Sequence, residues 1–225
     1  MSKRFFKPFV GKLYHEGIQG KRVLVLGASF YCNKTDCQFF KQCTDVNKKD
    51  SSAYDSICPA YAKENKLLSN EPSYCIIDYK PRTYQIFANC MQSLMGADGY
   101  KSTWERMAFT NYIQFFLPAT DGVFRDTRAS DMSERDFEVF IETLKELQPH
   151  IVIVWGCVIN SCLKQDNPYL VSKKELGETE WYLCHIQVPG VNHKIAILNP
   201  FHPSSSHWNK ALPVFKKYID KAIAE

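Results

Sequence analysis

The sequence predicts an α/β fold, a three-layer α/β/α sandwich around a short, mostly parallel four-stranded sheet. Two observations support this prediction. Apolar runs without polar alternation are typical of strands that are covered on both faces. Segments with helical spacing lie between these runs, and this alternation favours a sheet with helices on its faces. The four runs are residues 21–27, 108–116, 151–155 and 194–198.

Turn residues mark where the predicted strands end. The first run closes with Gly27, the third is followed by Gly156, and the fourth is followed by Asn199. The segment 181–198 is expected to form a hairpin, because residues 189–192 read Pro-Gly-Val-Asn, which is a turn signal.

Three helices are expected between and after the strands. One begins after Ser133, a good N-cap residue, and stops before Pro149. Residues 84–95 and 209–223 predict the other two. Residues 33–80, rich in Lys, Asp, Ser and Cys, follow no clear period.

The functional residues are expected at one edge of the sheet, because ligands of open α/β sheets bind beyond the carboxyl ends of the strands. The loop after the fourth strand is the most informative of these places, since it carries His202, three consecutive hydroxyl residues and His207. Hydroxyls and backbone amides can hold a phosphate, and a histidine can stabilise developing negative charge. A surface turn with an incidental histidine is the alternative reading.

Asn111 stands inside an otherwise apolar run. A buried amide offers a donor and an acceptor side by side, which suits the edge of a nucleobase. It can equally be a core asparagine that bonds to neighbouring backbone.

Taken in order, these motifs resemble the uracil-DNA glycosylase superfamily, particularly its compact bacterial branches. Residues 23–31 resemble the family's first strand and its glycine-led water-activating motif. Residues 109–113 are similar to the strand whose asparagine reads uracil, and His202-Pro203-Ser204 matches the His-Pro-Ser signature. The helix and strand at 131–156 complete a resemblance that extends over residues 21–223.

The resemblance implies roles for the residues that match. The target nucleotide would be flipped out of the stack, with Asn111 bonding the base edge, Gly27 contributing to the base-binding pocket, and His202 stabilising the oxygen that gains charge. An aromatic side chain of the first loop would stack on the base, and the last loop would hold the DNA backbone or wedge into the duplex. The stacking candidates are Phe30 and Tyr31, and the DNA-binding candidates are Ser204, Ser205, Ser206, His207 and Trp208.

The first motif departs from the family pattern. Many members carry an acidic or amide side chain that positions the attacking water, but here the position is Ala28. Ser29 is therefore the catalytic candidate of this loop, since its hydroxyl can orient water although it is a poor base unless a neighbour activates it.

Four of the nine cysteines fall within 27 residues, which defines a cysteine-rich insertion at residues 32–58. They suggest a zinc or iron–sulfur site, and iron–sulfur binding occurs in branches of the resembled superfamily. Their spacing lacks a Cys-x2-Cys pair, so reduced cysteine side chains without metal remain the alternative. The four residues are Cys32, Cys37, Cys43 and Cys58.

Composition bounds the remaining expectations. With 225 residues, 45% hydrophobic and 14% aromatic, the chain predicts one globular domain over residues 1–225 and excludes a disordered or repeat protein. No apolar stretch is long enough for a membrane span and the first residues do not resemble a secretory signal, so we expect a cytoplasmic monomer with no membrane or protein partner. The net charge of +4 and a basic arm at residues 1–20 permit a DNA partner.

Three functions remain open from the sequence. The first is an enzyme that hydrolyses the N-glycosidic bond of a uracil-type base in DNA, with no cofactor needed for the chemistry. The second is a catalytically silent DNA- or base-binding protein that kept the fold and lost the water-activating residue. The third is a hydrolase of free nucleosides or nucleotides.

Overall fold

A computed structural model describes residues 4–32, 70–95, 98–118, 127–156, 159, 163, 167–175 and 182–225. Its centre is a set of four parallel strands in the order β4, β2, β6 and β9. Each residue of these strands is buried, as expected for a sheet with two covered faces. The strands are β2 (Val23–Gly27), β4 (Met107–Asn111), β6 (Ile151–Val154) and β9 (Ile195–Leu198). The α/β class with a mostly parallel sheet is thereby confirmed.

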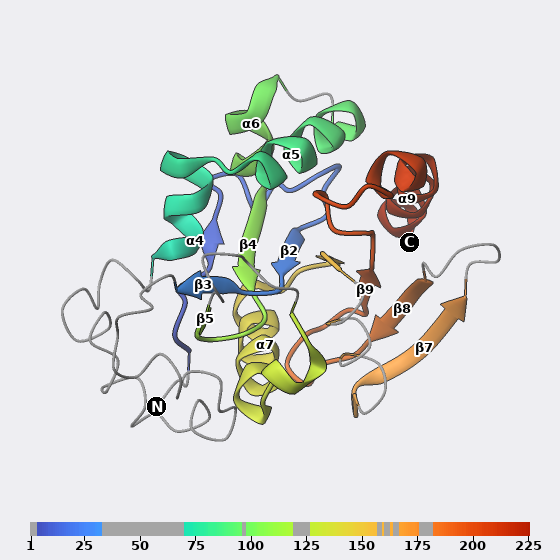
Figure 1. Ribbon diagram of the computed structural model, residues 1–225. Coiled ribbons are helices and arrows are strands. Elements are labelled where there is room, and N and C mark those ends of the chain that lie inside the picture. Colours follow the sequence, from blue (N-terminus) through green and yellow to red (C-terminus); the bar gives the residue numbers. More distant parts are fainter. Residues whose placement is uncertain are drawn as a thin grey trace.

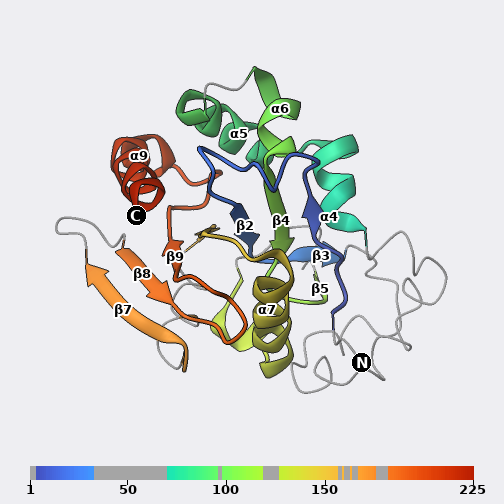
Figure 2. The same ribbon diagram turned by 180° about the vertical axis from the view of Figure 1, so that it is seen from behind.

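The sheet has seven strands, and the prediction of four was wrong. Strand β1 (Phe9–Val10) pairs antiparallel with β4 at one edge. Strands β8 (Tyr182–Ile186) and β7 (Leu170–Glu175) extend the sheet beyond β9 at the other edge, both antiparallel (Figure 2). Strand β1 is too short to show a periodic pattern. Strand β7 is an edge strand rich in Lys and Glu, so it does not form an apolar run that the sequence would reveal. The expected hairpin is present as β8 and β9.

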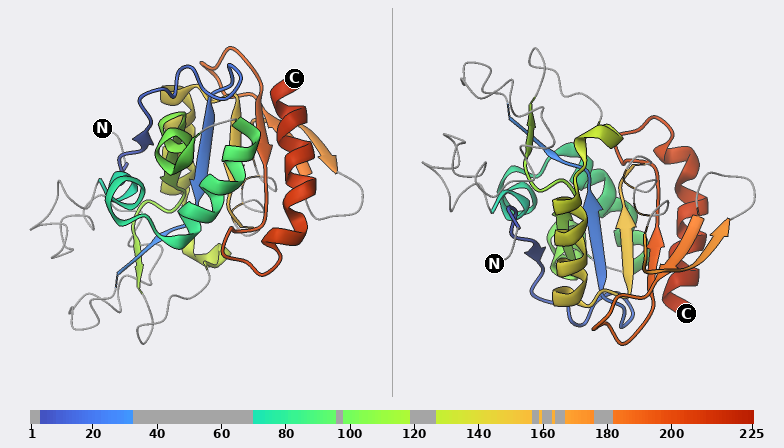
Figure 3. Two further views of the ribbon diagram at one scale, coloured as in Figure 1. Left: turned by 90° about the horizontal axis from the view of Figure 1, so that it is seen from above. Right: turned by 90° about the horizontal axis from the view of Figure 1, so that it is seen from below.

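Helices cover both faces of the sheet, which gives the three layers (Figures 1 and 3). Helices α5 (Arg82–Met95), α6 (Gly99–Glu105) and α9 (Trp208–Ala224) lie on one face, and α7 (Glu134–Leu147) covers the other. Side chains alternate between two cores, because successive residues of a strand point to opposite faces. Val23 and Val25 enter the core under α5 and α9, whereas Leu24 and Leu26 enter the core under α7.

Helix α7 begins as the sequence predicts. Ser133 is its N-cap, and a capping box pairs Ser133 with Asp136. The helix ends at Leu147, one residue before Gln148 adopts a left-handed conformation with φ of 51°. Pro149 follows, so the predicted stop is also confirmed.

Two short strands form a second sheet at the carboxyl side of the first. Strand β3 (Phe30–Cys32) pairs in parallel with β5 (Phe116–Pro118). The run that the sequence predicts as one strand over 108–116 is therefore broken, because the chain leaves the main sheet after Asn111 and turns through residues 112–115 before β5 begins.

A pair of stacked histidines lies at the opposite, amino edge of the sheet. The rings of His150 and His193 are 4.3 Å apart and nearly parallel. The backbone N–H of Arg22 donates to His150 Nδ1 over 3.0 Å. Burial, with the nearby charges of His193, Arg22 and Lys21, lowers the pKa of His150 to about 4.

We expect His150 to make folding sensitive to mild acid. Between pH 6.5 and pH 4 the unfolded chain binds a proton at this histidine that the folded chain does not, so stability is lost as the pH falls. Because the ring is partly exposed, the loss between pH 7 and pH 5 is about 1 kcal/mol. This loss is measured by urea unfolding of the wild type and of His150→Asn at both pH values. The asparagine amide oxygen can still accept the backbone N–H of Arg22.

The variant comparison is needed because Asp136 acts in the opposite direction. Burial raises the pKa of its carboxyl to about 6, so this group adds stability as the pH falls below 6. Both proteins contain Asp136, and the difference between them isolates His150. Equal pH dependence of the two unfolding free energies would contradict the prediction.

Candidate functional site

The carboxyl ends of the parallel strands bring the candidate residues to one edge. Gly27, the last residue of β2, is paired in register with Asn111, the last residue of β4. Strand β6 ends beside β2, and β9 ends beside β6, so the His202 loop leaves the sheet at this same edge. The placement agrees with the strand-end rule used on the sequence.

Asn111 is buried at this edge, with 3% of its surface exposed. Its Oδ1 lies directly over Gly27, where only a residue without a Cβ fits. Its Nδ2 has no hydrogen-bond partner among the described residues. A buried donor without a partner costs free energy, and such a group in a native fold is a candidate for contact with a ligand.

The backbone around Asn111 is fixed by Gln114, which lies in the run that the sequence predicts as one strand over 108–116. Gln114 is buried, and its Nε2 donates to the carbonyl of Asn111 over 2.8 Å. Its Oε1 accepts the backbone N–H groups of Phe5 and Phe6 at 3.2 and 3.3 Å. The backbone N–H of Gln114 in turn donates to Asp136 Oδ1 over 2.7 Å. One side chain thus ties the N-terminal segment to the end of β4.

Replacing Gln114 with methionine is expected to lower the free energy of unfolding by about 3 kcal/mol, because three buried backbone groups lose their partner. Methionine keeps the length of the side chain and removes only its polar atoms. The matched control is Gln85→Met, since Gln85 is exposed and its side chain donates to the carbonyl of Lys80. Chemical denaturation of both variants should show a control within about 0.5 kcal/mol of the wild type. Equal stability of the two variants would contradict the role of the Gln114 side chain in stabilising the fold.

His202 is held by its own loop. The backbone N–H of Ser204 reaches Nδ1 at 3.3 Å, and Ser204 Oγ lies 2.6 Å from the same nitrogen. A ring that accepts a backbone N–H at Nδ1 carries its proton at Nε2 when neutral. The His-Pro-Ser sequence therefore fixes the tautomer and presents Nε2 as a donor.

Trp155 contacts both His202 and Phe109, and Phe109 stands two residues before Asn111 on β4. The buried Trp155 side chain follows β6, and its ring lies 5.8 Å from that of His202, edge to face. On its other side it lies 5.4 Å from Phe109, which points to the same face of β4 as Asn111. Asn111 and His202 therefore share one edge and one face of the sheet.

Asn199 is a site residue that the sequence marked only as a strand end. It is buried, and its Nδ2 donates to the carbonyls of Val154 and Gly156 at 3.1 and 2.8 Å. Gly156 has a φ of 98°, so a glycine is required there. This amide fastens the end of β9 to the end of β6 and sets where the His202 loop begins.

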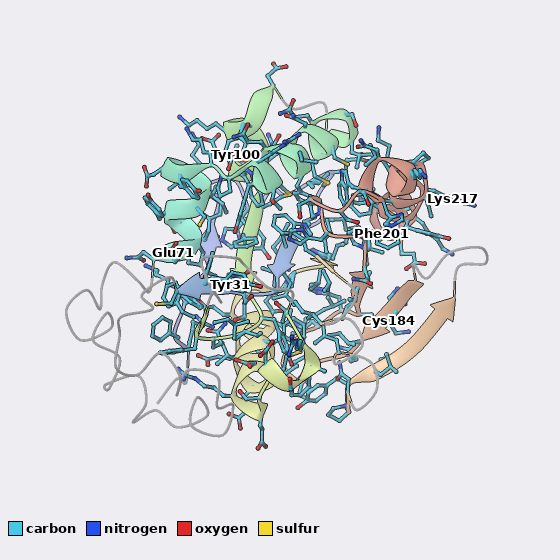
Figure 4. The ribbon with its side chains drawn as sticks, viewed as in Figure 1. Tyr31, Glu71, Tyr100, Cys184, Phe201 and Lys217 are labelled. Carbon is cyan, nitrogen blue, oxygen red and sulfur yellow. The ribbon has the colours of Figure 1, made fainter. Side chains whose placement is uncertain are left out.

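The side chains of the first loop differ in burial. Phe30 is buried and packs on Phe6 and Phe116, at ring distances of 4.9 and 6.3 Å, so it belongs to the core and we do not keep it as a base-stacking residue. Tyr31 is partly exposed near the centre of the view in Figure 4. Ser29 is also partly exposed, and its Oγ lies 3.1 Å from Thr127 Oγ1, which is itself 3.4 Å from the Tyr31 hydroxyl.

The DNA-binding candidates of the last loop also differ in exposure. Ser204, Ser206 and His207 are exposed and Ser205 is partly exposed. Trp208 is 3% exposed, because as the first residue of α9 it packs on Phe87 and Phe215. It therefore stabilises the core and cannot reach a duplex without unpacking.

The cysteine cluster lies mostly outside the described residues. Cys32 is at the end of β3, whereas Cys37, Cys43 and Cys58 are not among the described residues. Within the described ranges, no group of three or more His, Cys, Asp or Glu side chains is arranged to hold a metal ion.

No family model matches this chain, and the search of curated proteins finds no match either. Among the described helices, none combines the length and the apolar character that a membrane crossing requires.

Proposed function

We propose that the protein is a uracil-DNA glycosylase-like enzyme that hydrolyses the N-glycosidic bond of a flipped uracil-type base. The observation that carries the proposal is the buried Nδ2 of Asn111, which has no hydrogen-bond partner among the described residues and lies on the same edge and face as His202. An asparagine amide can donate to the O4 of uracil and accept from its N3–H. Free thymine presents the same two groups, so the amide alone does not separate the two bases.

The chemistry that this arrangement supports is stabilisation of a leaving base. When the bond between C1′ and N1 breaks, its electron pair stays on the base and negative charge develops on O2. A Nε2–H donor of His202 would stabilise that oxygen, and fixed donors of this kind often supply the largest catalytic contribution. Water then adds to C1′ and releases a proton to solvent, and the departing base anion takes up a proton from solvent, which leaves an abasic site and the free neutral base.

The first loop offers the attacking water a hydroxyl group and no carboxylate. Ala28 offers no polar side chain, and Ser29 has Thr127 as its hydroxyl neighbour. Neither the Ser29 hydroxyl nor the Thr127 hydroxyl acts as a base at neutral pH. Ser29 can orient the water, while the positive charge that develops on the sugar makes a strong base less necessary.

Ala28 is also the specific observation that favours the second candidate, a catalytically silent DNA- or base-binding protein. Such a protein would keep Asn111, His202 and the serine loop as a binding surface. DNA affinity that falls with salt, without release of a base, would distinguish it, because phosphate contacts release counterions.

The experiment is incubation of the purified full chain with single- and double-stranded oligonucleotides that contain one uracil, followed by alkaline cleavage at abasic sites. Cleavage at the uracil position supports the enzyme. Absence of cleavage at enzyme excess, together with salt-dependent binding of the same oligonucleotides, would replace the first candidate with the second. Absence of both cleavage and binding would contradict the two.

A further inference from the structure

Exposed apolar side chains gather on one short helical segment. Of the five large hydrophobic residues that are exposed in the described part of the chain, three lie within six positions. They are Tyr74, Ile77 and Tyr79, which are 49%, 56% and 66% exposed. The segment is the end of α4 (Glu71–Tyr74) and the π-helical turn η2 (Cys75–Tyr79).

The π-helical turn aligns the two tyrosines. In a π-helix the hydrogen bonds join residues five apart, so such residues lie closer to one face than they do in an α-helix. Tyr74 and Tyr79 are five apart, and their rings are parallel to within 7° with centroids 6.1 Å apart. Lys80 closes the turn in a left-handed conformation, with its backbone N–H bonded to the carbonyl of Cys75. The aromatic pair is therefore built into the backbone.

The inner side of this turn is anchored close to the candidate site. Cys75 and Ile76 are buried, and the Tyr100 hydroxyl donates to the carbonyl of Ile76 over 3.0 Å. Cys75 is a neighbour of Tyr84, and the Tyr84 ring lies 5.3 Å from Trp155. Since Trp155 contacts His202, two side chains separate the turn from the catalytic candidate.

The charges next to the tyrosines favour a polyanion. Lys80 and Arg82 are exposed directly after Tyr79, and Asp78 is the one exposed carboxylate between Tyr74 and Arg82. Aromatic rings flanked by cations are the usual construction of single-strand binding surfaces, because every base has a face that can stack.

We propose that Tyr74, Ile77 and Tyr79, with Lys80 and Arg82, form a stacking platform for unpaired nucleotides of DNA. This inference rests on the proposed function and deepens it, since a platform beside the site holds the strand whose base is withdrawn. It specifies a preference for single-stranded or locally opened DNA.

The test is the affinity of the full chain for a fluorescent oligothymidylate without uracil, measured by anisotropy at low salt. The double variant Tyr74→Ala/Tyr79→Ala is expected to bind about tenfold or more weakly, since stacking on aromatic side chains dominates such contacts. Tyr74→Phe/Tyr79→Phe keeps the rings and should bind like the wild type. Val171→Ala removes another exposed apolar side chain, on β7, and is the matched control.

The cations are tested in the same assay. Lys80→Gln/Arg82→Gln should weaken binding and reduce the dependence of affinity on salt by about one to two counterions. Lys217→Gln is the control, because Lys217 is exposed on α9, across the molecule from Glu71 of α4 (Figure 4). No effect of the paired substitution beyond that of the control would overturn the electrostatic part.

The outcomes separate this inference from the proposed function, because the probe carries no uracil. Weaker binding by the alanine pair, with no base release by the wild type, would support the platform and contradict the enzyme. Base release with unchanged affinity of the alanine pair would overturn the platform. A wild type that does not bind the probe overturns it as well. The platform is also overturned if the alanine pair binds the probe like the wild type and differs from it only in self-association, measured by sedimentation. That result would indicate that this face contacts another protein molecule.

Discussion

Replacing His202 with alanine is expected to slow the release of uracil by about 100- to 1000-fold, the usual effect of removing one donor to a developing oxyanion. The ring is held by Ser204, so its Nε2 donor is in place before the substrate arrives. Single-turnover release from a uracil oligonucleotide, with enzyme in excess, measures the chemical step without product release.

The control for this substitution is His15→Ala. His15 is exposed in the segment that precedes β2, on the amino side of the sheet, and should not touch the reaction. Its variant is expected to release uracil at the wild-type rate. A His202→Ala rate within threefold of the wild type, with unchanged stability, would remove His202 from the mechanism.

Replacing Gly27 with alanine is also expected to lower the rate of uracil release strongly. A Cβ at this position would overlap Asn111 Oδ1 and come within 3.1 Å of Phe109 Cζ. The contacts lie at the end of the central strand, where the backbone cannot move away. The amide of Asn111 must therefore rotate or shift, and uracil release should fall about as far as it does in Asn111→Ala.

Overpacking also costs stability, about 1–3 kcal/mol for an added methyl in a close-packed site. Gly190→Ala provides the control for this cost. Gly190 has a φ of 88° with open space around it, so alanine strains the backbone at the opposite edge without touching the site. Both variants should lose stability, and only Gly27→Ala should lose activity. Equal activity of Gly27→Ala and the wild type would contradict the position assigned to Asn111.

The sequence predicted the central strands because their signal is local. Strands β2, β6 and β9 are continuous apolar runs that end in residues typical of turns, and such runs need no tertiary information to be recognised. The start of α7 was predictable for the same reason, since a capping box lies within four residues.

The prediction went wrong where burial comes from a loop. The run over 108–116 is mostly apolar, but its second half is buried by the turn around Gln114 and not by sheet pairing. Gln114 stands in that run, and two of the backbone partners of its side chain, the N–H groups of Phe5 and Phe6, come from the distant N-terminal segment. Only the folded chain brings them together, so no sequence period could have identified it.

The candidate site shows the same division. The rule for parallel strand ends was sufficient to bring Asn111 and His202 to one edge. The burial of Phe30 and Trp208 could not be predicted, because an aromatic side chain on a loop packs against whichever surface the tertiary structure offers. The π-helical turn that aligns Tyr74 with Tyr79 was equally hidden, since it lies within residues 33–80, where the sequence has no clear period.

The most direct test of the central claim, that Asn111 reads the base, is a comparison of uracil and cytosine release by the wild type and by Asn111→Asp. An ionised aspartate only accepts hydrogen bonds, which suits the amino group of cytosine and opposes the O4 of uracil. We predict that the wild type releases uracil and not cytosine, and that Asn111→Asp loses most uracil release and gains measurable cytosine release. Unchanged preference for uracil in the variant would contradict the account.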